Sequence, residues 1–302
     1  NGIESHRRRG NKAQLGQKRR TFGVNRLPGL LSIHHHPGSR ENQAEGIDIK
    51  VLEVLELVVG SAGVTAALED RAVAVTAVSP SLAKSELEIA RREAVLIGIR
   101  HVELQTSEFR RPEYQRNAGD RCFFCKDTLY SLMALSLPKL GVKTIVNGAN
   151  TDDQGDHRPG MQAALDYQVR SPLIEEGLSK ANVRELARYW KLSVAEKPAA
   201  PCLSSRIAYG VEVTEERVLR VERAEAFLKN LTGIQELRVR HEANELARIE
   251  VPVQQVARLL EPDSRAKITA EFHSLGFRFV TVDLDGFRSG SLNSALPLVE
   301  LK

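Results

Sequence analysis

Two of the chain's three cysteines, Cys122 and Cys125, lie three residues apart in GDRCFFCKDTLY, and the third, Cys202, lies in KPAAPCLSSRIAYG. Residues three apart on a helix share one face, so the two thiols of the pair are expected side by side. Near a helix N-terminus the dipole and the free N–H groups favour the thiolate, which binds metal ions and attacks electrophiles. The segment therefore predicts a metal site, a redox site or a pair of buried structural cysteines.

Cys202 is the one cysteine left to complete a metal site with this pair. Three thiolates on a [4Fe–4S] cluster leave one iron open to solvent or to an added ligand. The redox alternative, a thioredoxin-type dithiol, requires its motif directly after a strand. The 76 residues between Cys125 and Cys202 do not show whether the three thiols converge. On the residues alone, all three interpretations stay open.

The segment NGANTDDQGDHRPG, residues 147–160, is a second candidate site. Its small residues permit close approach of the backbone to a phosphate or a ribose, and acidic side chains of this kind hold Mg²⁺. The alternative is a solvent-exposed loop shaped by Asx turns. The predicted nucleotide-binding residues of this segment are Gly148, Asn150, Asp153, Asp156 and Arg158.

Arginines form a third group of candidates. Arg238 and Arg240 lie two apart on a predicted strand, and so on the same face. Two adjacent guanidinium groups repel each other unless an anion lies between them, and their fork of donors suits phosphate. The alternative is a solvent-facing strand. Together with the segment CLSSR and the turn DGFRSG, the predicted phosphate-binding residues are Ser205, Arg206, Arg238, Arg240 and Arg288.

A regular alternation of strands and helices positions these residues. RAVAVTAV (71–78) is a short β-branched run, as expected for a strand buried on both faces. RHVELQT (100–106) and KTIVNGA (143–149) are further predicted strands. Strands that alternate with helices indicate parallel βαβ units in a doubly wound sheet. Ligands of such sheets bind beyond the carboxyl ends of the strands, where the segment 147–160 begins.

Three helices are predicted between and after these strands. Ser85 and Glu88 are spaced as a capping box at the start of the first, which ends at Gly98. CFFCKDTLYSLMALSLPKLG forms the second and ends near residues 138–141. SKANVRELARYWKL forms the third, with Val183, Leu186, Ala187 and Trp190 on one apolar face.

The composition changes after about residue 206. TEERVLRVERAEAFLKNLTG predicts a helix with Thr214 as N-cap. QELRVRH and LARIEV follow as strands, then a helical segment through 253–275 and the strand FRFVTVDL. We therefore expect a tail at 1–45, a nucleotide-binding domain at 46–206 and a small α+β substrate- and phosphate-binding domain at 207–302.

The 302 residues are 42% hydrophobic, enough for real cores. No apolar run is long enough to span a membrane and no signal-peptide pattern stands at the beginning, so a soluble cytoplasmic protein is expected. Three cysteines in a chain of this length argue for a reducing compartment.

The net charge of +4 belongs to the first residues of the chain. Residues 1–45 carry nine Lys or Arg against three Glu, a charge of +6, so the rest sums to −2. An acidic body argues against a nucleic-acid partner. The segment 1–45 shows no period of 2 or 3.6, and we expect it to be disordered or outside the fold. His34, His35 and His36 within it could bind a metal, but a solvated tail is the stronger reading.

Five segments, in this order, resemble the LarE family: AVTAVSPSL, NGANTDDQGDHRPG, KPAAPCLSSRIAYG, LRVRHEANELARIEVP and DLDGFRSGSLN. These are ATP-dependent sulfur transferases of the PP-loop pyrophosphatase type (adenine nucleotide alpha hydrolase type), which make the nickel-pincer nucleotide cofactor of lactate racemase. The resemblance covers about residues 70–302. It implies that ATP adenylylates a carboxylate of a pyridinium-3,5-biscarboxylic acid mononucleotide, and that sulfur replaces the AMP.

The resemblance also implies roles for particular residues. One branch of the family takes the sulfur from a cysteine at the position of Cys202, which becomes dehydroalanine. Another has three cysteines that hold a [4Fe–4S] cluster carrying an additional sulfide, and Cys122, Cys125 and Cys202 match that pattern. Lys126 matches a lysine near the substrate, and Arg206, Arg238 and Arg240 match a phosphate clamp. The implied cofactors are ATP, Mg²⁺ and the cluster; the implied partners are a sulfur donor protein and further copies of the chain.

One feature departs from the family. Its SGGxDS loop, which binds pyrophosphate between the first strand and the first helix, is missing. The corresponding region reads VLELVVGSAGVTAALEDRAVAVTAV, where only ten residues separate LVV from Asp70, too few for the loop and a three-turn helix. A misread reading frame or a loss of ATP chemistry explains this, and both predict weak or no adenylylation.

Two alternative functions follow from this departure. The first is a decayed PP-loop protein that binds a nucleotide or an Fe–S cluster without ATP chemistry. The second is another PP-loop activity. Of its two forms, tRNA thiolation conflicts with the acidic body, and amidation leaves the cysteines unexplained.

Overall fold

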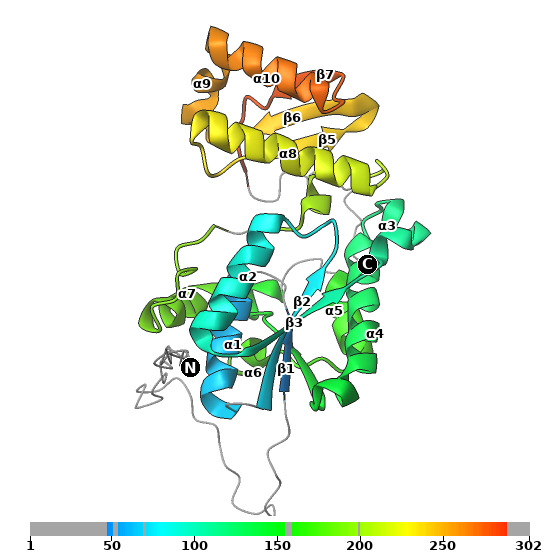
Figure 1. The fold of residues 1–302 in the computed structure, drawn as a ribbon, viewed down its shortest axis with the longest axis vertical. Helices are drawn as coiled ribbons and strands as arrows, with labels where there is room; N and C mark the ends of the chain where they lie inside the picture. Colours follow the sequence, from blue (N-terminus) through cyan, green and yellow to red (C-terminus); the bar gives the residue numbers. More distant parts are fainter. Residues whose placement is uncertain (1–46, 51–53, 69–70, 155–158, 199, 289–302) are drawn as a thin grey trace, which may run out of the picture.

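A computed structural model describes residues 47–50, 54–68, 71–154, 159–198 and 200–288, which build two sheets (Figure 1). The larger sheet is parallel in the order β3-β2-β1-β4. The smaller has the order β5-β6-β7. The strands of the larger sheet are β1 Ile47–Lys50, β2 Ala72–Val78, β3 Arg100–Gln105 and β4 Thr144–Asn147; those of the smaller are β5 Arg238–Glu242, β6 Leu246–Glu250 and β7 Phe279–Val282.

Helices cover both faces of the parallel sheet (Figure 1). α1 (Val54–Leu68), α2 (Lys84–Ile97) and α7 (Lys180–Tyr189) lie on one face, and α4 (Arg121–Leu140) and α5 (Pro159–Asp166) on the other. The alternation along β2 explains this: Ala72 and Ala74 are buried with α1, α2 and α7, while Val73 and Val75 are buried with α4 and α5. The chain is therefore an α/β protein.

The predicted strands at 71–78, 100–106 and 143–149 are confirmed as β2, β3 and β4. The predicted cysteine helix is α4, which ends at Leu140 with Gly141 in the left-handed region at φ 77°. The apolar face of the third predicted helix is also confirmed, since Val183, Leu186 and Ala187 on α7 are buried. These elements are set by local periodicity, which is why the sequence predicts them.

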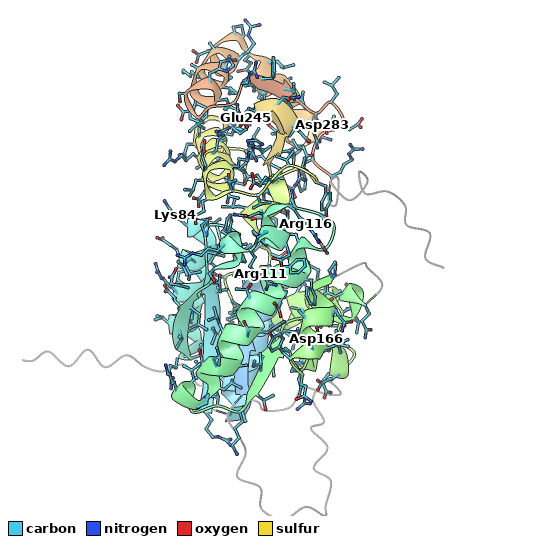
Figure 2. All side chains as sticks on the ribbon, turned by 90° about the vertical axis from the view of Figure 1, so that its right-hand side faces the viewer. Lys84, Arg111, Arg116, Asp166, Glu245 and Asp283 are labelled. Carbon is cyan, nitrogen blue, oxygen red and sulfur yellow. The ribbon has the colours of Figure 1, made fainter. Side chains whose placement is uncertain are left out.

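The capping box predicted at Ser85 and Glu88 is wrong. α2 begins at Lys84, and its N-cap residue Ala83 makes no side-chain cap. The backbone N–H of Lys84 instead donates to Glu222 Oε1 at 2.8 Å. Glu222 lies on α8 (Glu215–Thr232), so a carboxylate from the smaller unit caps this helix. Figure 2 shows Lys84 at the junction between the two units.

The region that corresponds to the family's pyrophosphate loop, including LVV and the following GSAGVT, is helical. Residues 54–68 form the single helix α1, with Val58, Val59 and Ala62 buried in the core. The strand in the centre of the sheet is β1, which pairs in parallel with β2 and β4. A short apolar run fits a buried strand and a buried helix equally well, and here the helix forms.

The smaller unit agrees with its prediction. Thr214 caps α8, where its side chain accepts from Arg217 N at 3.2 Å. β5 and β6 pair antiparallel, and β7 joins β6 in parallel after the helices α9 (Val256–Leu260) and α10 (Pro262–Ser274). The core of this unit also contains Phe109, Tyr114 and Leu203. A boundary after residue 206 stays a prediction, because residues before it belong to this core.

Among the described helices, none combines the length and the apolar character that a membrane span requires.

Candidate functional site

The N-terminus of α4 meets the segment that carries Cys202. Arg121, the first residue of α4, is 6% exposed, and its Nη1 donates to the carbonyl oxygen of Ser204 at 2.9 Å. Ser204 belongs to η4 (Leu203–Arg206), a 3₁₀ helix for which Cys202 is the N-cap. Cys122 and Cys202 are exposed and Cys125 is half-buried, all as free thiols. The structure therefore brings Cys122 and the Cys202 segment to one guanidinium group.

The electrostatics of Arg121 and Tyr114 report the same gathering. Burial acts to lower the pKa of Arg121, but negative charge on Cys202 and Cys122 outweighs it, and the net pKa is raised. The pKa of Tyr114 is raised well above its usual value by burial first, and then by Cys202 and Cys125. Each thiol is thus close enough to act on this buried pair. A guanidinium placed here attracts anionic sulfur.

The thiols have the chemistry of a metal site without a preformed geometry. The three free thiols are soft donors of the kind that hold Fe–S clusters. Within the part of the chain that the structure describes, however, no three or more His, Cys, Asp or Glu side chains form a group that could hold a metal ion. The donor set fits a cluster chemically, and its assignment as a ligand set remains a prediction.

The Cys202 segment is fixed at the carboxyl edge of the parallel sheet. The backbone N–H of Leu203 donates to Ser81 O at 2.8 Å, directly beyond the end of β2. The carbonyl oxygen of Cys202 accepts from Ser205 N at 3.0 Å and from Ser205 Oγ at 2.7 Å. Parallel α/β sheets bind their ligands at this edge.

Three buried arginines lie behind this segment: Arg206, Arg238 and Arg240 are 4%, 9% and 6% exposed. Arg206 Nε pairs with Glu225 Oε1 at 3.0 Å, and Arg240 Nη2 pairs with Glu250 Oε2 at 2.9 Å. Burying guanidinium groups is costly unless they are paired and hydrogen-bonded. The burial of Arg238 and Arg240 is compatible with the prediction that they bind a phosphate from one face of the strand. The alternative, a solvent-facing strand, is wrong because β5 is buried.

The closeness of the three guanidinium groups changes the pKa of Arg238. Burial lowers this pKa most, the charges of Arg206 and Arg240 lower it further, and Glu225 opposes them; the resulting pKa is about 10. Its guanidinium lies over the Phe287 ring at 5.1 Å. An anion bound beside Arg238 would favour the charged form. The cluster is therefore suited to phosphate.

Arg288 is placed differently from these three. It is exposed, and its Nη2 pairs with Asp285 Oδ2 at 3.1 Å.

The loop after β4 is shaped by its own side chains. Asn150 Oδ1 accepts from Asp152 N at 3.0 Å, and Asp153 Oδ2 accepts from Asn150 N at 2.9 Å, which closes a capping box on η3 (Thr151–Asp153). Gly148 and Asn150 are buried. Asn150 and Asp153 therefore have the turn-forming role of the Asx alternative. Asp156 and Arg158 lie outside the described residues.

Lys126 lies where α4 and α5 approach each other. A Cβ on Gly160 would stand 2.9 Å from Lys126 Cγ and 3.5 Å from the carbonyl oxygen of Cys122. Glycine at this position thus permits the close approach of α5 to Lys126.

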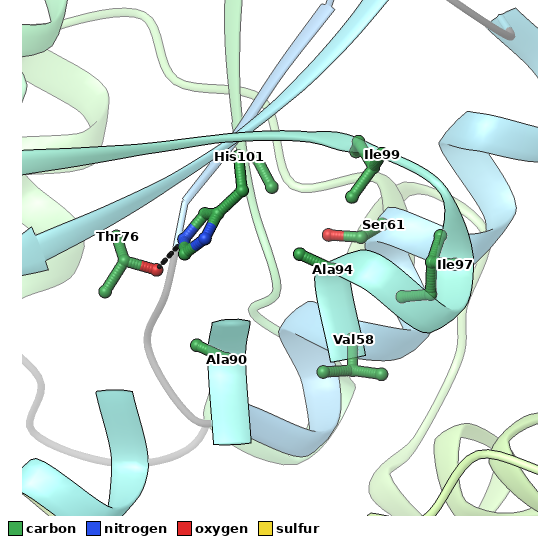
Figure 3. A pocket seen from close by; sticks show the side chains of 9 residues that line it. Val58, Ser61, Thr76, Ala90, Ala94, Ile97, Ile99 and His101 are labelled. Carbon is green, nitrogen blue, oxygen red and sulfur yellow. Dashed lines mark hydrogen bonds between the residues drawn. The ribbon is translucent and has the colours of Figure 1, made fainter. Parts of the chain in front are cut away.

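A small apolar pocket lies on the opposite face of the sheet, between α1, α2, β2 and β3 (Figure 3). Its polar groups include Thr76 and His101, whose Oγ1 and Nε2 are 2.8 Å apart. Burial lowers the pKa of His101, with Glu103 opposing. The pocket lies on the face away from α4 and is not part of the thiol site.

Sequence reasoning missed several residues of the site. Arg121, Asn117, Glu225 and Glu250 are buried and charged or polar. A signal existed for one of them: Asn tolerates the left-handed backbone that Asn117 adopts at φ 54°. The burial of the others depends on contacts between segments far apart in the chain.

The chain is similar in sequence to several known proteins. An uncharacterized protein of Synechocystis sp., slr1717, is 45% identical over 229 residues, which are 76% of this chain and 85% of that protein. The pyridinium-3,5-bisthiocarboxylic acid mononucleotide synthase of Lactiplantibacillus plantarum is 35% identical over 62% of this chain and 66% of the synthase. An uncharacterized protein of Methanocaldococcus jannaschii, MJ0830, is 28% identical over 58% of this chain and 66% of its own length. No family model matches.

These similarities, with the parallel α/β sheet, define the class of protein. The 45% identity over most of slr1717 shows that the chain belongs to one family with that protein. The chain is also similar to the synthase, in agreement with the resemblance that the five segments of the sequence indicated. The alignments with the synthase and with MJ0830 each span slightly less than two thirds of those proteins.

Proposed function

We propose that this chain is a LarE-type sulfur transferase that acts on a pyridinium-3,5-biscarboxylic acid mononucleotide. ATP, with Mg²⁺, adenylylates one carboxylate and releases pyrophosphate; sulfur then displaces AMP and leaves a thiocarboxylate, for the nickel cofactor of lactate racemase. The 35% identity to the synthase supports the substrate class. The parallel sheet with helices on both faces supports a doubly wound fold of the PP-loop type.

One contact carries the proposal. Arg206 Nη1 donates to the carbonyl oxygen of Cys202 at 3.1 Å, while its Nε pairs with Glu225. The residue that bears the proposed sulfur and the arginine cluster that suits a phosphate are therefore parts of one hydrogen-bonded unit. An acyl transfer on a nucleotide needs these two functions next to each other.

The arginine cluster would hold the phosphate of the mononucleotide. Arg238 and Arg240 lie two residues apart on one strand, and guanidinium forks bind phosphate oxygens with paired hydrogen bonds. Lys126, on the side of α4 that faces α5, would stabilise the negative charge of the adenylate. Asn150 and Asp153 would contribute by fixing the loop at the carboxyl edge of the sheet.

Cys202 is the proposed nucleophile when the protein itself supplies the sulfur. Its Sγ attacks the acyl carbon of the adenylate, and AMP leaves with the bridging oxygen. Loss of the Cα proton of residue 202 and cleavage of its Cβ–Sγ bond then release the thiocarboxylate and leave dehydroalanine. In the three-cysteine alternative, Cys122, Cys125 and Cys202 would hold a [4Fe–4S] cluster, which supplies a sulfide nucleophile when it is bound.

A second candidate function is a LarE-like protein that binds the mononucleotide without ATP chemistry. The helix α1 favours it, because this helix includes Gly60 and Gly63 where the family has its pyrophosphate loop.

Anaerobic incubation with the mononucleotide, ATP and Mg²⁺ separates the two candidates. Pyrophosphate release together with a thiocarboxylate, measured by mass spectrometry, is the result for the complete enzyme. Binding of the mononucleotide without pyrophosphate release is the result for the second candidate. The Lactiplantibacillus plantarum synthase is the positive control. If the chain does not bind the mononucleotide at all, both proposals are wrong.

A further inference from the structure

The turn before α4 is joined to the segment after Cys202 by the side chain of Asn117. Asn117 is fully buried, and its Nδ2 donates to the carbonyl oxygens of Ala208 at 2.8 Å and Val211 at 2.9 Å. The backbone carbonyl oxygen of Asn117 accepts a further hydrogen bond from Gly210 N at 3.2 Å. The two segments, about ninety residues apart in the chain, are thus one packed unit.

Arg121 extends this unit to the thiols. Its Nη1 donates both to Asn117 Oδ1 and to the carbonyl oxygen of Ser204, the latter at 2.9 Å. Ser204 is also held through its hydroxyl, which lies 2.7 Å from Tyr114 Oη. Cys122 follows Arg121 directly, and Cys202 precedes Ser204 by two residues. One guanidinium therefore connects the backbone positions of both exposed thiols.

A buried guanidinium restrains its surroundings because its donors need partners in the folded state. Without the side chain of Arg121, the carbonyl oxygen of Ser204 and the Oδ1 of Asn117 would both lose this donor inside the protein. The 3₁₀ turn that carries Cys202 would then be free to move relative to α4. Arg206, the other arginine of this turn, donates to the carbonyl oxygen of Cys202 within the turn and pairs with Glu225 on α8. Among the described residues, its hydrogen bonds and ion pairs do not reach α4.

We propose that Arg121 is a positioning residue that holds Cys202 beside Cys122, so that the two thiols serve one site. The inference rests on the proposed function in one respect, because sulfur transfer is the reason why the two thiols would act together. The distance between the Cys122 and Cys202 thiols, however, can be tested without carrying out the reaction.

Dibromobimane tests this spacing, because it becomes strongly fluorescent when it bridges two nearby thiols. The full-length chain carrying Cys125→Ser keeps only Cys122 and Cys202. Arg121→Met and Arg121→Lys are compared in this background, free of metal and nucleotide. Arg116→Met is the matched control, because Arg116 is exposed at the same turn, pairs with Asp120 at 2.5 Å and is seen at the junction in Figure 2.

We expect Arg121→Met to lower the yield of bridged protein about tenfold, the effect of losing a hydrogen bond from a charged donor. Alkylation of each thiol by iodoacetamide should change by less than about twofold, since both thiols stay exposed. Arg121→Lys keeps a cation and a donor, and should restore part of the bridging. Arg116→Met should bridge like the parent.

Three results would overturn the inference. They are an absence of bridging in the parent, undiminished bridging in a folded Arg121→Met protein, and, if Arg121→Met does not fold, bridging in Arg121→Lys equal to that of the parent. Failure of the proposed function is a separate outcome, because bridging uses no ATP and no mononucleotide. A protein that bridges its thiols but transfers no sulfur keeps the inference and refutes the proposed function.

Discussion

Arg240 on β5 donates from its Nη1 to the carbonyl oxygen of Ser205 at 3.1 Å, which joins the smaller sheet to the turn that carries Cys202. Its Nε and Nη2 meanwhile pair with Glu250. The arginine cluster is therefore held in place on both sides before any ligand arrives. Such preorganisation lowers the cost of binding an anion.

Replacing Arg238 with Gln should weaken binding of the mononucleotide about tenfold or more, since hydrogen bonds to charged groups contribute about 1.5–3 kcal/mol. The corresponding nucleoside, which lacks the phosphate, should bind the variant and the parent alike. Isothermal titration calorimetry of both ligands measures this. Arg278→Gln, at an exposed arginine of the same unit, is the control. Equal losses for nucleoside and mononucleotide would show that Arg238 does not contact the phosphate.

Each of the three cysteines should be required for iron. Anaerobic reconstitution with iron and sulfide should give a brown protein, and replacement of Cys122, Cys125 or Cys202 by Ser should remove most of the colour and iron. The reason is that a cluster held by three thiolates has no spare ligand. Iron analysis and visible absorbance provide the measurement. A colourless parent, or a single variant with its full iron content, contradicts the three-cysteine assignment.

Replacing Glu222 with Ala should destabilise the protein by about 1 kcal/mol, the usual cost of losing a helix N-cap. The carboxylate accepts from Lys84 N at 2.8 Å and so satisfies the first turn of α2. Glu222→Gln keeps an acceptor and should lose less. Denaturant unfolding at fixed pH measures both. If Ala and Gln cost the same, Glu222 acts by its charge alone and not as a hydrogen-bonded cap.

Stability should fall as the pH drops through the range below about 6.5, partly because of His101. Burial lowers the pKa of His101 from its ordinary value of 6.5, so the unfolded chain takes up this proton at a higher pH than the folded protein. The contribution of the neutral His101 ring to the free energy of unfolding is complete above the pKa of this histidine in the unfolded chain. It is lost as the pH falls through the pKa of His101 in the folded protein. His101→Asn should reduce this loss, measured as unfolding free energy at about pH 7.5 and about pH 5.5. His273→Asn, at an exposed histidine of the smaller unit, is the control.

The sequence predicted the elements that local periodicity decides. β2, α4, α7 and α8 follow from apolar period, caps and a terminal glycine. The Cys-x-x-Cys pair lies on a helix as expected, near its first turn. The similarity to the synthase was also predictable from the sequence, because five separate segments carry the resemblance.

The remaining features depend on contacts that no local pattern encodes. Glu222 caps α2 from 138 positions away in the chain, so no pattern near α2 could reveal it. The spacing of Ser85 and Glu88 resembled a capping box and gave the wrong N-cap. The apolar run at the start of α1 is compatible with a strand by composition and becomes a helix through packing on α2 and α7. Arg121 has the sequence context of a surface charge, and only the fold shows it buried between Asn117 and Ser204.

The most direct test of the central claim begins after the adenylylation step. The adenylylated mononucleotide, prepared separately, is added anaerobically to the full chain, and thiocarboxylate and AMP are measured by mass spectrometry. The account predicts that both form in equal amounts with the parent and that thiocarboxylate is absent with Cys202→Ser, since Cys202 and the arginine cluster are one unit. Thiocarboxylate formed equally well by Cys202→Ser, or by neither protein, would contradict it.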